Sequence, residues 1–230
     1  MPIDRFYLKG SYQKDNIVTL EDEEFHHLSR VMRKKEGERV ELVNGEGLLA
    51  EASIQELHKR KATLAVESIE LHKPEIPPLI LIQALPKLSN LELIIQKGTE
   101  LGVSDFYVFP SERSEKKDLS EQQKKRLNLI KIGAMKQCGR FDLPSFHFVP
   151  NLKNLSLPEG NAFFGDLRSS IPLPKSQSPY QLFIGPEKGF TKKEHLMFEK
   201  LFQAQGIRFH PYTLRAETAA IAALALAASF

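Results

Sequence analysis

Short runs of alternating apolar and polar residues fill the first third of the chain. Such alternation is typical of strands that bury one face. Five segments carry it: 5–9, 17–20, 39–43, 48–57 and 62–71. The dipeptide Asn44-Gly45 between two of them favours a hairpin turn. Many short strands predict a small β-barrel over residues 1–72.

One helix is expected to interrupt these strands. Phe25, Leu28 and Met32 fall on one face at helical spacing, and Thr19 or Asp22 precedes them as a possible N-cap. The three prolines within residues 73–78 then predict a linker rather than a helix or strand.

From residue 79 onward, apolar strands alternate with helical stripes. Strands are expected at 79–85, 106–109, 146–149 and 162–165. A helix ending at Gly102 carries Leu91, Ile94 and Ile95 on one face, and a Ser120–Gln123 capping box opens another helix, which runs through residue 137. This alternation predicts an α/β domain over residues 79–230, with a mostly parallel sheet covered by helices.

The end of the chain contains two strand–loop–helix units. In the first, an apolar run over residues 182–184 stops at Gly185-Pro186, a Thr191–Glu194 capping box opens a helix, and Gly206 is expected to end it. In the second, a strand at 207–211 leads through a loop to a helix of Ala, Leu and Ile from Thr218 to residue 228, which should be buried on most sides. Ligands of open α/β sheets bind at the carboxyl ends of such strands.

The glycine loop after the first of these strands has no recognised phosphate-binding pattern. It lacks both the Gly-Lys-Ser/Thr ending of a P-loop and the Gly-x-Gly-x-x-Gly of dinucleotide sites. On spacing alone a tight turn is the favoured interpretation, and an enzyme that binds a nucleotide phosphate here is an alternative.

Composition narrows the function classes without choosing one. A net charge of +3 over 230 residues is only mildly basic, so nucleic-acid binding must depend on where individual cations lie. A single cysteine, Cys138, excludes an internal disulfide and a cysteine-based zinc site, and the histidines show no metal-ligand spacing. The start of the chain lacks a signal-peptide pattern, and the terminal apolar helix is too short to span a bilayer. We therefore expect a cytoplasmic protein without a metal site or a membrane segment.

Several motifs, taken in order, resemble one enzyme family. They are Arg5–Tyr7, His26–Arg33, Lys97–Val103, Ser111–Ser114, Gln137–Arg140, Ile184–Phe190 and Leu214–Ala219. The set resembles the RsmE-type members of the SPOUT methyltransferase superfamily, which methylate N3 of a uridine in 16S ribosomal RNA with S-adenosylmethionine. Lys188 replaces a glycine of the family pattern, and Ala216 replaces a threonine.

The resemblance implies a PUA-like RNA-binding barrel followed by a SPOUT domain with a trefoil knot, in which the last helix passes through an earlier loop. It also implies an S-adenosylmethionine site built from the two loops near the end of the chain. The expected cofactor-binding residues are Gly165, Ile184, Gly185, Pro186, Glu187, Gly189, Leu214, Thr218 and Ala219.

Methylation of uridine N3 requires a proton to be removed or shared. A positioned base contributes about 10²–10⁴-fold, and a cation near O2 or O4 stabilises the uridine anion. Arg215 is the candidate cation and Glu217 the candidate base. An equally good interpretation makes Glu217 an acid that stabilises a helix N-terminus.

RNA binding needs cations for the phosphate backbone. The arginines within the family motifs are the candidates: Arg5, Arg30, Arg33, Arg113 and Arg140. The expected partner is 16S rRNA or the small ribosomal subunit. Related enzymes are homodimers, and the apolar last helix has enough surface for an interface as well as a core.

Three alternatives remain from the sequence. One is a related methyltransferase that acts on tRNA or on a ribose 2′-OH, and another is the nucleotide-binding enzyme described above. The third is an RNA-binding ribosome-assembly factor without catalysis, which the Lys188 and Ala216 departures leave open.

Overall fold

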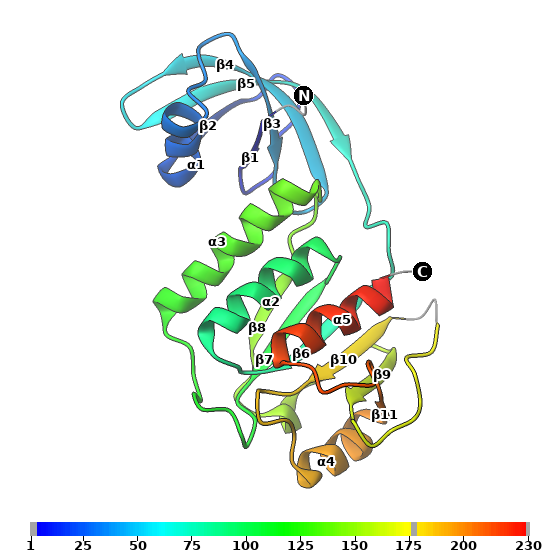
Figure 1. The fold of residues 1–230 in the computed structure, drawn as a ribbon. Helices are drawn as coiled ribbons and strands as arrows, with labels where there is room; N and C mark the ends of the chain where they lie inside the picture. The colour runs from blue at the N-terminus through cyan, green and yellow to red at the C-terminus, as the bar shows by residue number, and fades with distance from the viewer. Residues whose placement is uncertain (1–3, 176–178, 229–230) are drawn as a thin grey trace. The chain divides into compact units, whose positions relative to one another are not determined.

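The computed structural model describes residues 4–175 and 179–228 (Figure 1). One unit of the chain runs to Glu75 and includes Met135–Leu143, and the other comprises Ile76–Ala134 and the residues from Pro144 onward. The sequence predicted continuous domains, whereas residues 135–143 group with the first unit. The boundaries 1–72, 73–78 and 79–230 remain predictions, and residues 1–3, 176–178 and 229–230 within them lie outside the described part.

A five-stranded sheet forms the first unit, in the order β1-β3-β4-β5-β2. Its strands are β1 (Arg5–Tyr7), β2 (Ile17–Glu21), β3 (Arg39–Val43), β4 (Leu48–Leu57) and β5 (Lys61–Leu71). β1 runs parallel to β3, and the other neighbours are antiparallel. The alternating apolar residues face a shared core that includes Phe6, Leu42 and Leu64, and the long strands β4 and β5 curl (Figure 1). The strands predicted from the pattern are confirmed within two residues at each end.

The hairpin between β3 and β4 follows the predicted turn chemistry. Asn44 Oδ1 accepts hydrogen bonds from the main-chain N–H groups of Glu46 (2.8 Å) and Leu48 (3.1 Å). Gly45 and Gly47 have φ angles of 78° and 90°, which side chains with a Cβ disfavour.

The first helix of this unit begins between the two predicted N-caps, with Glu21 as its N-cap and Asp22 as its first residue. Thr19 lies within β2, where it pairs with Thr63, so it is not an N-cap. Helix α1 (Asp22–His26) follows directly and continues as a π-helical segment, η1 (His27–Val31), and its N-cap Glu21 makes no side-chain cap. Leu28 is buried but Met32 is 37% exposed, because the helical segment ends at Val31.

The second unit is a six-stranded, fully parallel sheet in the order β11-β9-β10-β6-β7-β8. The strands are β6 (Leu79–Ala84), β7 (Asp105–Phe109), β8 (Ser145–Phe148), β9 (Asn161–Gly165), β10 (Tyr180–Ile184) and β11 (Gln205–Ile207). The predicted α/β class is thereby confirmed. A short 3₁₀ segment, η2 (Leu152–Asn154), follows β8.

Helices cover both faces of this sheet. Helices α2 (Leu88–Glu100), α3 (Glu121–Cys138) and α5 (Ala216–Ala228) contribute to a core on one face, and α2 and α5 lie side by side (Figure 1). Helix α4 (Lys192–Phe202) packs through Phe198 on the other face. Successive residues of β6 divide between the two cores, Leu81 on one side and Ile82 on the other, as the pleat requires. None of the described helices is both long and apolar enough to cross a membrane.

The ends of the helices in the second unit can be compared with the predicted capping motifs. The Ser120–Gln123 and Thr191–Glu194 capping boxes are both confirmed by reciprocal hydrogen bonds. Gly206 does not end α4, because it lies within β11. The helix stops at Gln203, whose φ of 53° is left-handed. Helix α5 begins at Ala216, two residues before the predicted start. The trefoil knot implied by the resemblance stays a prediction.

Candidate functional site

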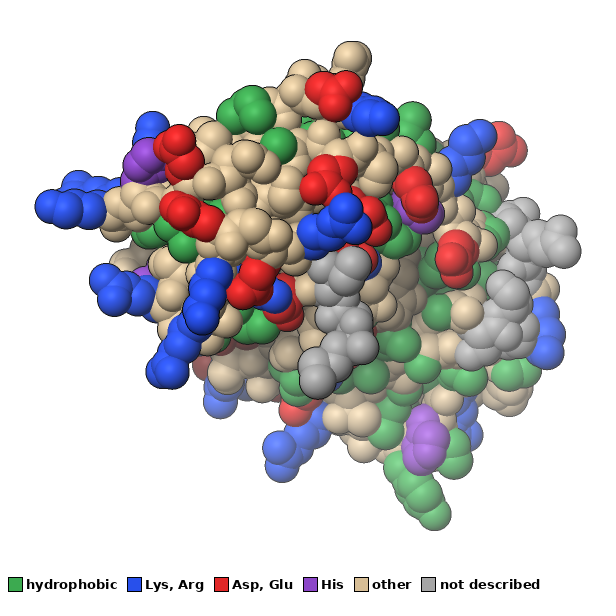
Figure 2. All heavy atoms as spheres, turned by 90° about the horizontal axis from the view of Figure 1, so that it is seen from above, with side chains coloured by type: hydrophobic (Ala, Val, Ile, Leu, Met, Phe, Trp, Pro, Cys, Tyr) green, Lys and Arg blue, Asp and Glu red, His purple; other side chains and the backbone are tan. Residues whose placement is uncertain are grey.

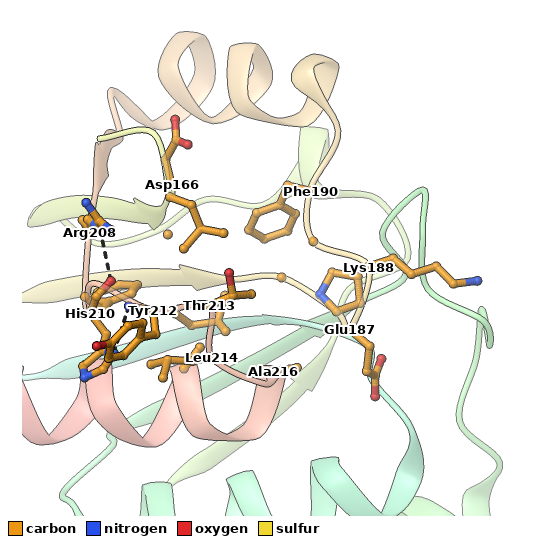
Figure 3. Close-up of a pocket in the computed structure, with 18 of the residues that line it drawn as sticks. Asp166, Glu187, Lys188, Phe190, Arg208, His210, Tyr212, Thr213, Leu214 and Ala216 are labelled. Atoms are coloured by element: carbon orange, nitrogen blue, oxygen red, sulfur yellow. Dashed lines mark hydrogen bonds between the residues drawn. The ribbon is translucent and has the colours of Figure 1, made fainter. Parts of the chain in front are cut away.

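A cavity of about 300 Å³ lies at the carboxyl ends of β9, β10 and β11 (Figure 3). Its walls come from the residues after each strand and from the first turn of α5. They are Gly165–Leu167, Ile184–Phe190, Ile207–His210, Tyr212–Leu214, Ala216 and Ala219. The two tail segments, 184–190 and 207–219, therefore form a single pocket, as expected at the carboxyl ends of parallel strands.

The segment 185–190, called here the glycine loop, is a tight turn. Gly189 N–H donates to the carbonyl of Pro186 at 2.8 Å, and Gly189 has a φ of 65°. A Cβ on Gly185 would lie 3.2 Å from Gly189 Cα. Glycine is therefore needed at Gly185 for close packing within the loop, and at Gly189 for its backbone conformation.

Hydrogen bonds with β6 and with the start of α2 hold the glycine loop in place. Gln83, fully buried in β6, donates from Nε2 to the carbonyls of Ile184 and Gly185, both at 3.3 Å. Glu187 accepts at Oε1 from the main-chain N–H of Lys87 (3.0 Å) and from Asn90 Nδ2 (2.9 Å). Burial raises the pKa of the Glu187 carboxyl, but these hydrogen bonds and one from its own main chain outweigh burial, so the net pKa is lowered. Glu187 thus acts as an anionic clamp on the loop.

Several main-chain groups of the loop have no hydrogen-bond partner among the described residues. Within the described residues, the Gly189 carbonyl and the Phe190 N–H make no hydrogen bond, and both residues line the cavity. Lys188 is exposed, and its side chain extends away from the cavity (Figure 3). Its replacement of a glycine therefore leaves the cavity volume unobstructed.

Every predicted cofactor residue except Thr218 lines the cavity. Thr218 is exposed on α5 and lies outside the lining. The candidate catalytic residues Arg215 and Glu217 are also absent from the lining: Arg215 is exposed, and Glu217 is half-buried in the first turn of α5. Their roles, like those of the lining residues, remain predictions.

Sequence reasoning missed the aromatic and polar residues that complete the walls. Phe190 and Phe209 supply aromatic surface, and a Cβ on Gly165 would lie 3.1 Å from the Phe209 ring. Arg208 donates to the carbonyl of His210 at 3.2 Å, which shapes the second loop (Figure 3). The sequence placed residues 208–210 inside a strand predicted at 207–211, whereas β11 ends at Ile207, so the fold alone puts them in the cavity wall.

Asp166, which follows β9, belongs to a charged cluster at the edge of the cavity. Arg168 donates to its carboxylate at 2.9 Å and thereby lowers the pKa of that group. Arg168 Nη2 also lies 3.1 Å from His195 Nδ1, and burial lowers the pKa of the His195 imidazole. The cluster fixes the loop after β9. Among the described residues no group of three or more His, Cys, Asp and Glu is placed to hold a metal ion.

The arginines predicted to bind RNA divide into three kinds. Arg5 pairs with Glu41 at 2.6 Å and lies 4.9 Å from the Phe141 ring, and Arg140 pairs with Asp142. Arg30 and Arg33 are exposed, with no ion pair among the described residues. Arg113 donates to main-chain carbonyls of the glycine loop.

The charge pattern of the surface agrees with the modest net charge. On the face in Figure 2, basic and acidic side chains of the described residues are interspersed. On this face, RNA recognition would therefore depend on a few cations rather than on a uniform basic surface.

Comparison with known proteins gives the family. An RNA methyltransferase domain model matches residues 73–228, and an RNA methyltransferase PUA domain model matches residues 20–67. The ribosomal RNA small subunit methyltransferase E of Bacillus subtilis is 33% identical, over 94% of this chain and 91% of its own length. The chain belongs to this methyltransferase family.

Solved structures of similar chains agree with this membership. A Legionella pneumophila protein described as a methyltransferase, solved with the cofactor S-adenosylmethionine, is 28% identical with a TM-score of 0.85, over 98% of this chain and 97% of that one. The ribosomal RNA small subunit methyltransferase E of Neisseria gonorrhoeae shares the fold, with a TM-score of 0.87 at 24% identity over 97% of this chain and 96% of that one. The predicted SPOUT-type fold with an N-terminal PUA domain is thereby confirmed.

Proposed function

We propose that this protein transfers the methyl group of S-adenosylmethionine to N3 of a uridine in 16S rRNA of the small ribosomal subunit. Family membership over almost the whole chain carries the proposal. The cavity at the carboxyl ends of β9, β10 and β11 supports it, because it lies where the family motifs predict the cofactor.

The residues of the cavity fit the cofactor. Its volume, about 300 Å³, falls at the lower end of the roughly 300–1,000 Å³ typical of small-molecule sites. Leu214, Ala216 and Ala219 offer apolar surface for an adenine ring, and the unpaired Gly189–Phe190 peptide group can offer a nucleoside either its carbonyl or its N–H. Glycine at positions 185 and 189 keeps the main chain close to such a ligand.

When bound, S-adenosylmethionine supplies an activated methyl group on a sulfonium. The glycine loop then has to hold that cofactor in one orientation, and orientation alone can lower a barrier by roughly 7–11 kcal/mol. Glu217 would receive the N3 proton, and Arg215 would stabilise the charge that develops on the uracil oxygens. Both side chains lie in or next to the first turn of α5, adjoining the cavity residues Leu214 and Ala216.

RNA contacts, subunit assembly and location complete the proposal. The exposed arginines Arg30 and Arg33 are suited to phosphate groups, and the PUA domain match supports RNA binding by the first unit. We also propose a homodimer, as the resemblance implies, and a cytoplasmic place of action.

The decisive experiment is transfer of a labelled methyl group. The protein is incubated with labelled S-adenosylmethionine and either small ribosomal subunits from cells that lack the enzyme or bulk tRNA, and the RNA is digested to nucleosides. We expect label in 3-methyluridine from the subunits only. Label in tRNA or in a 2′-O-methyl nucleoside would favour the related methyltransferase, and cofactor binding without transfer would favour an assembly factor.

A further inference from the structure

The side chain of Arg113 reaches the main chain of the glycine loop. Its Nη1 donates to the carbonyl oxygens of Lys188 at 2.8 Å and Phe190 at 3.4 Å. The sequence assigned Arg113 to RNA. In the structure, the guanidinium instead contacts two carbonyls that flank the Gly189–Phe190 peptide group.

The loop that carries Arg113, residues 111–117, is itself held in place. Ser111 and Ser114 are 1% and 5% exposed, and their hydroxyls are 3.3 Å apart. The main-chain N–H of Ser111 donates to Ser114 Oγ at 3.2 Å, and Lys117 Nζ donates to the Ser111 carbonyl at 2.6 Å. Buried hydroxyls that satisfy one another make this turn rigid.

A buried carboxylate connects this loop to the start of α4. Glu194, 5% exposed, accepts at Oε1 from the Glu112 N–H (3.0 Å) and at Oε2 from the Thr191 N–H (2.8 Å). Glu194 therefore fixes the residue before Arg113 and the residue after the glycine loop at the same time. The guanidinium is held beside the loop before any ligand arrives.

These contacts determine which main-chain groups are available to a ligand. The N–H groups of Gly189 and Thr191 are already bonded within the protein, and Arg113 holds the carbonyls of Lys188 and Phe190. Among the main-chain groups left without a hydrogen bond in the described residues are the Gly189 carbonyl and the Phe190 N–H, which belong to one peptide group between two cavity-lining residues. The two groups point to opposite sides of this trans peptide, and rotation of either flanking peptide would change which of them faces the cavity.

We propose that Arg113 is a positioning residue that fixes the Gly189–Phe190 peptide for the cofactor and has no primary role in binding RNA. The inference rests on the proposed function, because it takes S-adenosylmethionine as the ligand. A hydrogen bond from a charged donor is stronger than one from a neutral donor, and the two N–H bonds of Nη1, fixed in the guanidinium plane, can serve the two carbonyls. Lysine keeps the charge but lacks this fixed planar geometry.

The test uses Arg113→Ala and Arg113→Lys in the full chain, with Arg126→Ala as a matched control. Arg126 is also exposed and joins two elements of the same unit, α3 and α2, through hydrogen bonds to Glu92 at 2.5 and 2.9 Å. Calorimetry measures the Kd for S-adenosylmethionine, filter binding measures the Kd for isolated small ribosomal subunits, and initial rates with the same subunits give KM and kcat. We expect both Arg113 variants to raise the cofactor Kd and KM about tenfold, with kcat at saturating cofactor unchanged and the cofactor Kd of the control unchanged.

The RNA measurement separates the two interpretations of this arginine. Arg113→Lys should bind small subunits as the wild type does, while its cofactor affinity falls. If both Arg113 variants bind the cofactor with the wild-type Kd, the inference is wrong. If they also lose affinity for the small subunit, Arg113 acts on RNA instead. A wild-type protein that binds no S-adenosylmethionine would instead overturn the proposed function itself.

Discussion

Asn90 donates a hydrogen bond from its side-chain Nδ2 to Glu187 Oε1 over 2.9 Å. Asn90 lies in the first turn of α2, and the same carboxylate oxygen accepts from the main-chain N–H of Lys87, the N-cap of that helix. Lys87 provides no side-chain cap of its own. A carboxylate from the glycine loop therefore satisfies the start of a helix about one hundred residues earlier, which ties the cavity wall to α2.

Removing the Glu187 carboxylate should loosen both partners. For Glu187→Ala we expect a loss of about 1 kcal/mol in the free energy of unfolding and a cofactor Kd several-fold higher, measured by urea denaturation and calorimetry. Glu121→Ala, at the exposed start of α3, is the control for loss of an acid near a helix N-terminus. An unchanged cofactor Kd in Glu187→Ala would show that the clamp does not shape the site.

The direction of the Glu187 pKa sets the pH range of this effect. Because its pKa is lowered in the folded protein from an ordinary value of 4.5, its contribution is complete above that value. The contribution is lost as pH falls through the lower, folded pKa. The stability difference between wild type and Glu187→Ala should therefore be constant from about pH 6 to 8 and shrink only in acid.

Two glycines of the same loop should respond differently to alanine. In Gly185→Ala the new Cβ would meet main-chain atoms of Gly189 at 3.2 Å and 3.4 Å, whereas in Gly189→Ala nothing lies within 4 Å and the φ of 65° is the only strain. We expect Gly185→Ala to weaken cofactor binding by more than about tenfold and Gly189→Ala to cost roughly 1 kcal/mol of stability. Gly133→Ala, in open space on α3, should stabilise the protein by roughly 0.5–1 kcal/mol. Equal cofactor affinities for the two loop variants would contradict this steric argument.

Glu217 has an oxygen that the rest of the protein leaves without a partner. Its Oε2 is buried and makes no hydrogen bond among the described residues, an arrangement that is costly for a carboxylate. This favours the hypothesis that Glu217 is a base over a role confined to the start of α5. We expect Glu217→Gln to lower kcat at least about 10²-fold at saturating cofactor, with Tm nearly unchanged. A normal kcat with a lowered Tm would instead support the structural role.

Arg215 should also affect the methyl-transfer step, through stabilisation of the uridine anion rather than through proton removal. It is exposed, so Arg215→Ala is expected to fold normally. Loss of a cation that stabilises the uridine anion should lower kcat by roughly 10²–10³-fold and leave the Kd for S-adenosylmethionine unchanged. Wild-type turnover of small ribosomal subunits by this variant would remove the catalytic role.

Burial of Lys131 should make the free energy of unfolding increase as the pH rises into the mildly alkaline range. It is 5% exposed on α3 and donates from Nζ to the Pro144 carbonyl at 2.7 Å, and burial lowers its pKa from 10.5 to about 8. The unfolded chain therefore holds a proton that the folded chain releases between pH 8 and 10.5, so folding is favoured as pH rises through that range. Relative to Lys131→Met, the wild type should gain roughly 2 kcal/mol between pH 7.5 and 10, measured by urea denaturation. Lys125→Met, exposed on the same helix, should show no such difference.

Local patterns determined the elements of this fold. Alternation marked the strands because each one buries a single face or runs through the core, and the Thr191–Glu194 capping box marked the start of α4 because its two hydrogen bonds form within four residues. The end of the same helix could not be predicted in this way. Gly206 looked like the stop, but its pairing with Phe164 of β9 takes it into a strand, and Gln203 adopts the left-handed conformation instead.

In the candidate site, too, local sequence patterns identified some residues and the tertiary structure decided the others. Spacing and family motifs identified the residues of the two loops, because glycine, proline and small side chains have local reasons to occur there. Only the tertiary structure decided that Gln83, Asn90 and Arg113 support the glycine loop, since each contact joins residues at least 75 positions apart. Sequence patterns carry information about neighbours along the chain, whereas the order of strands in the sheet decides which distant side chains meet.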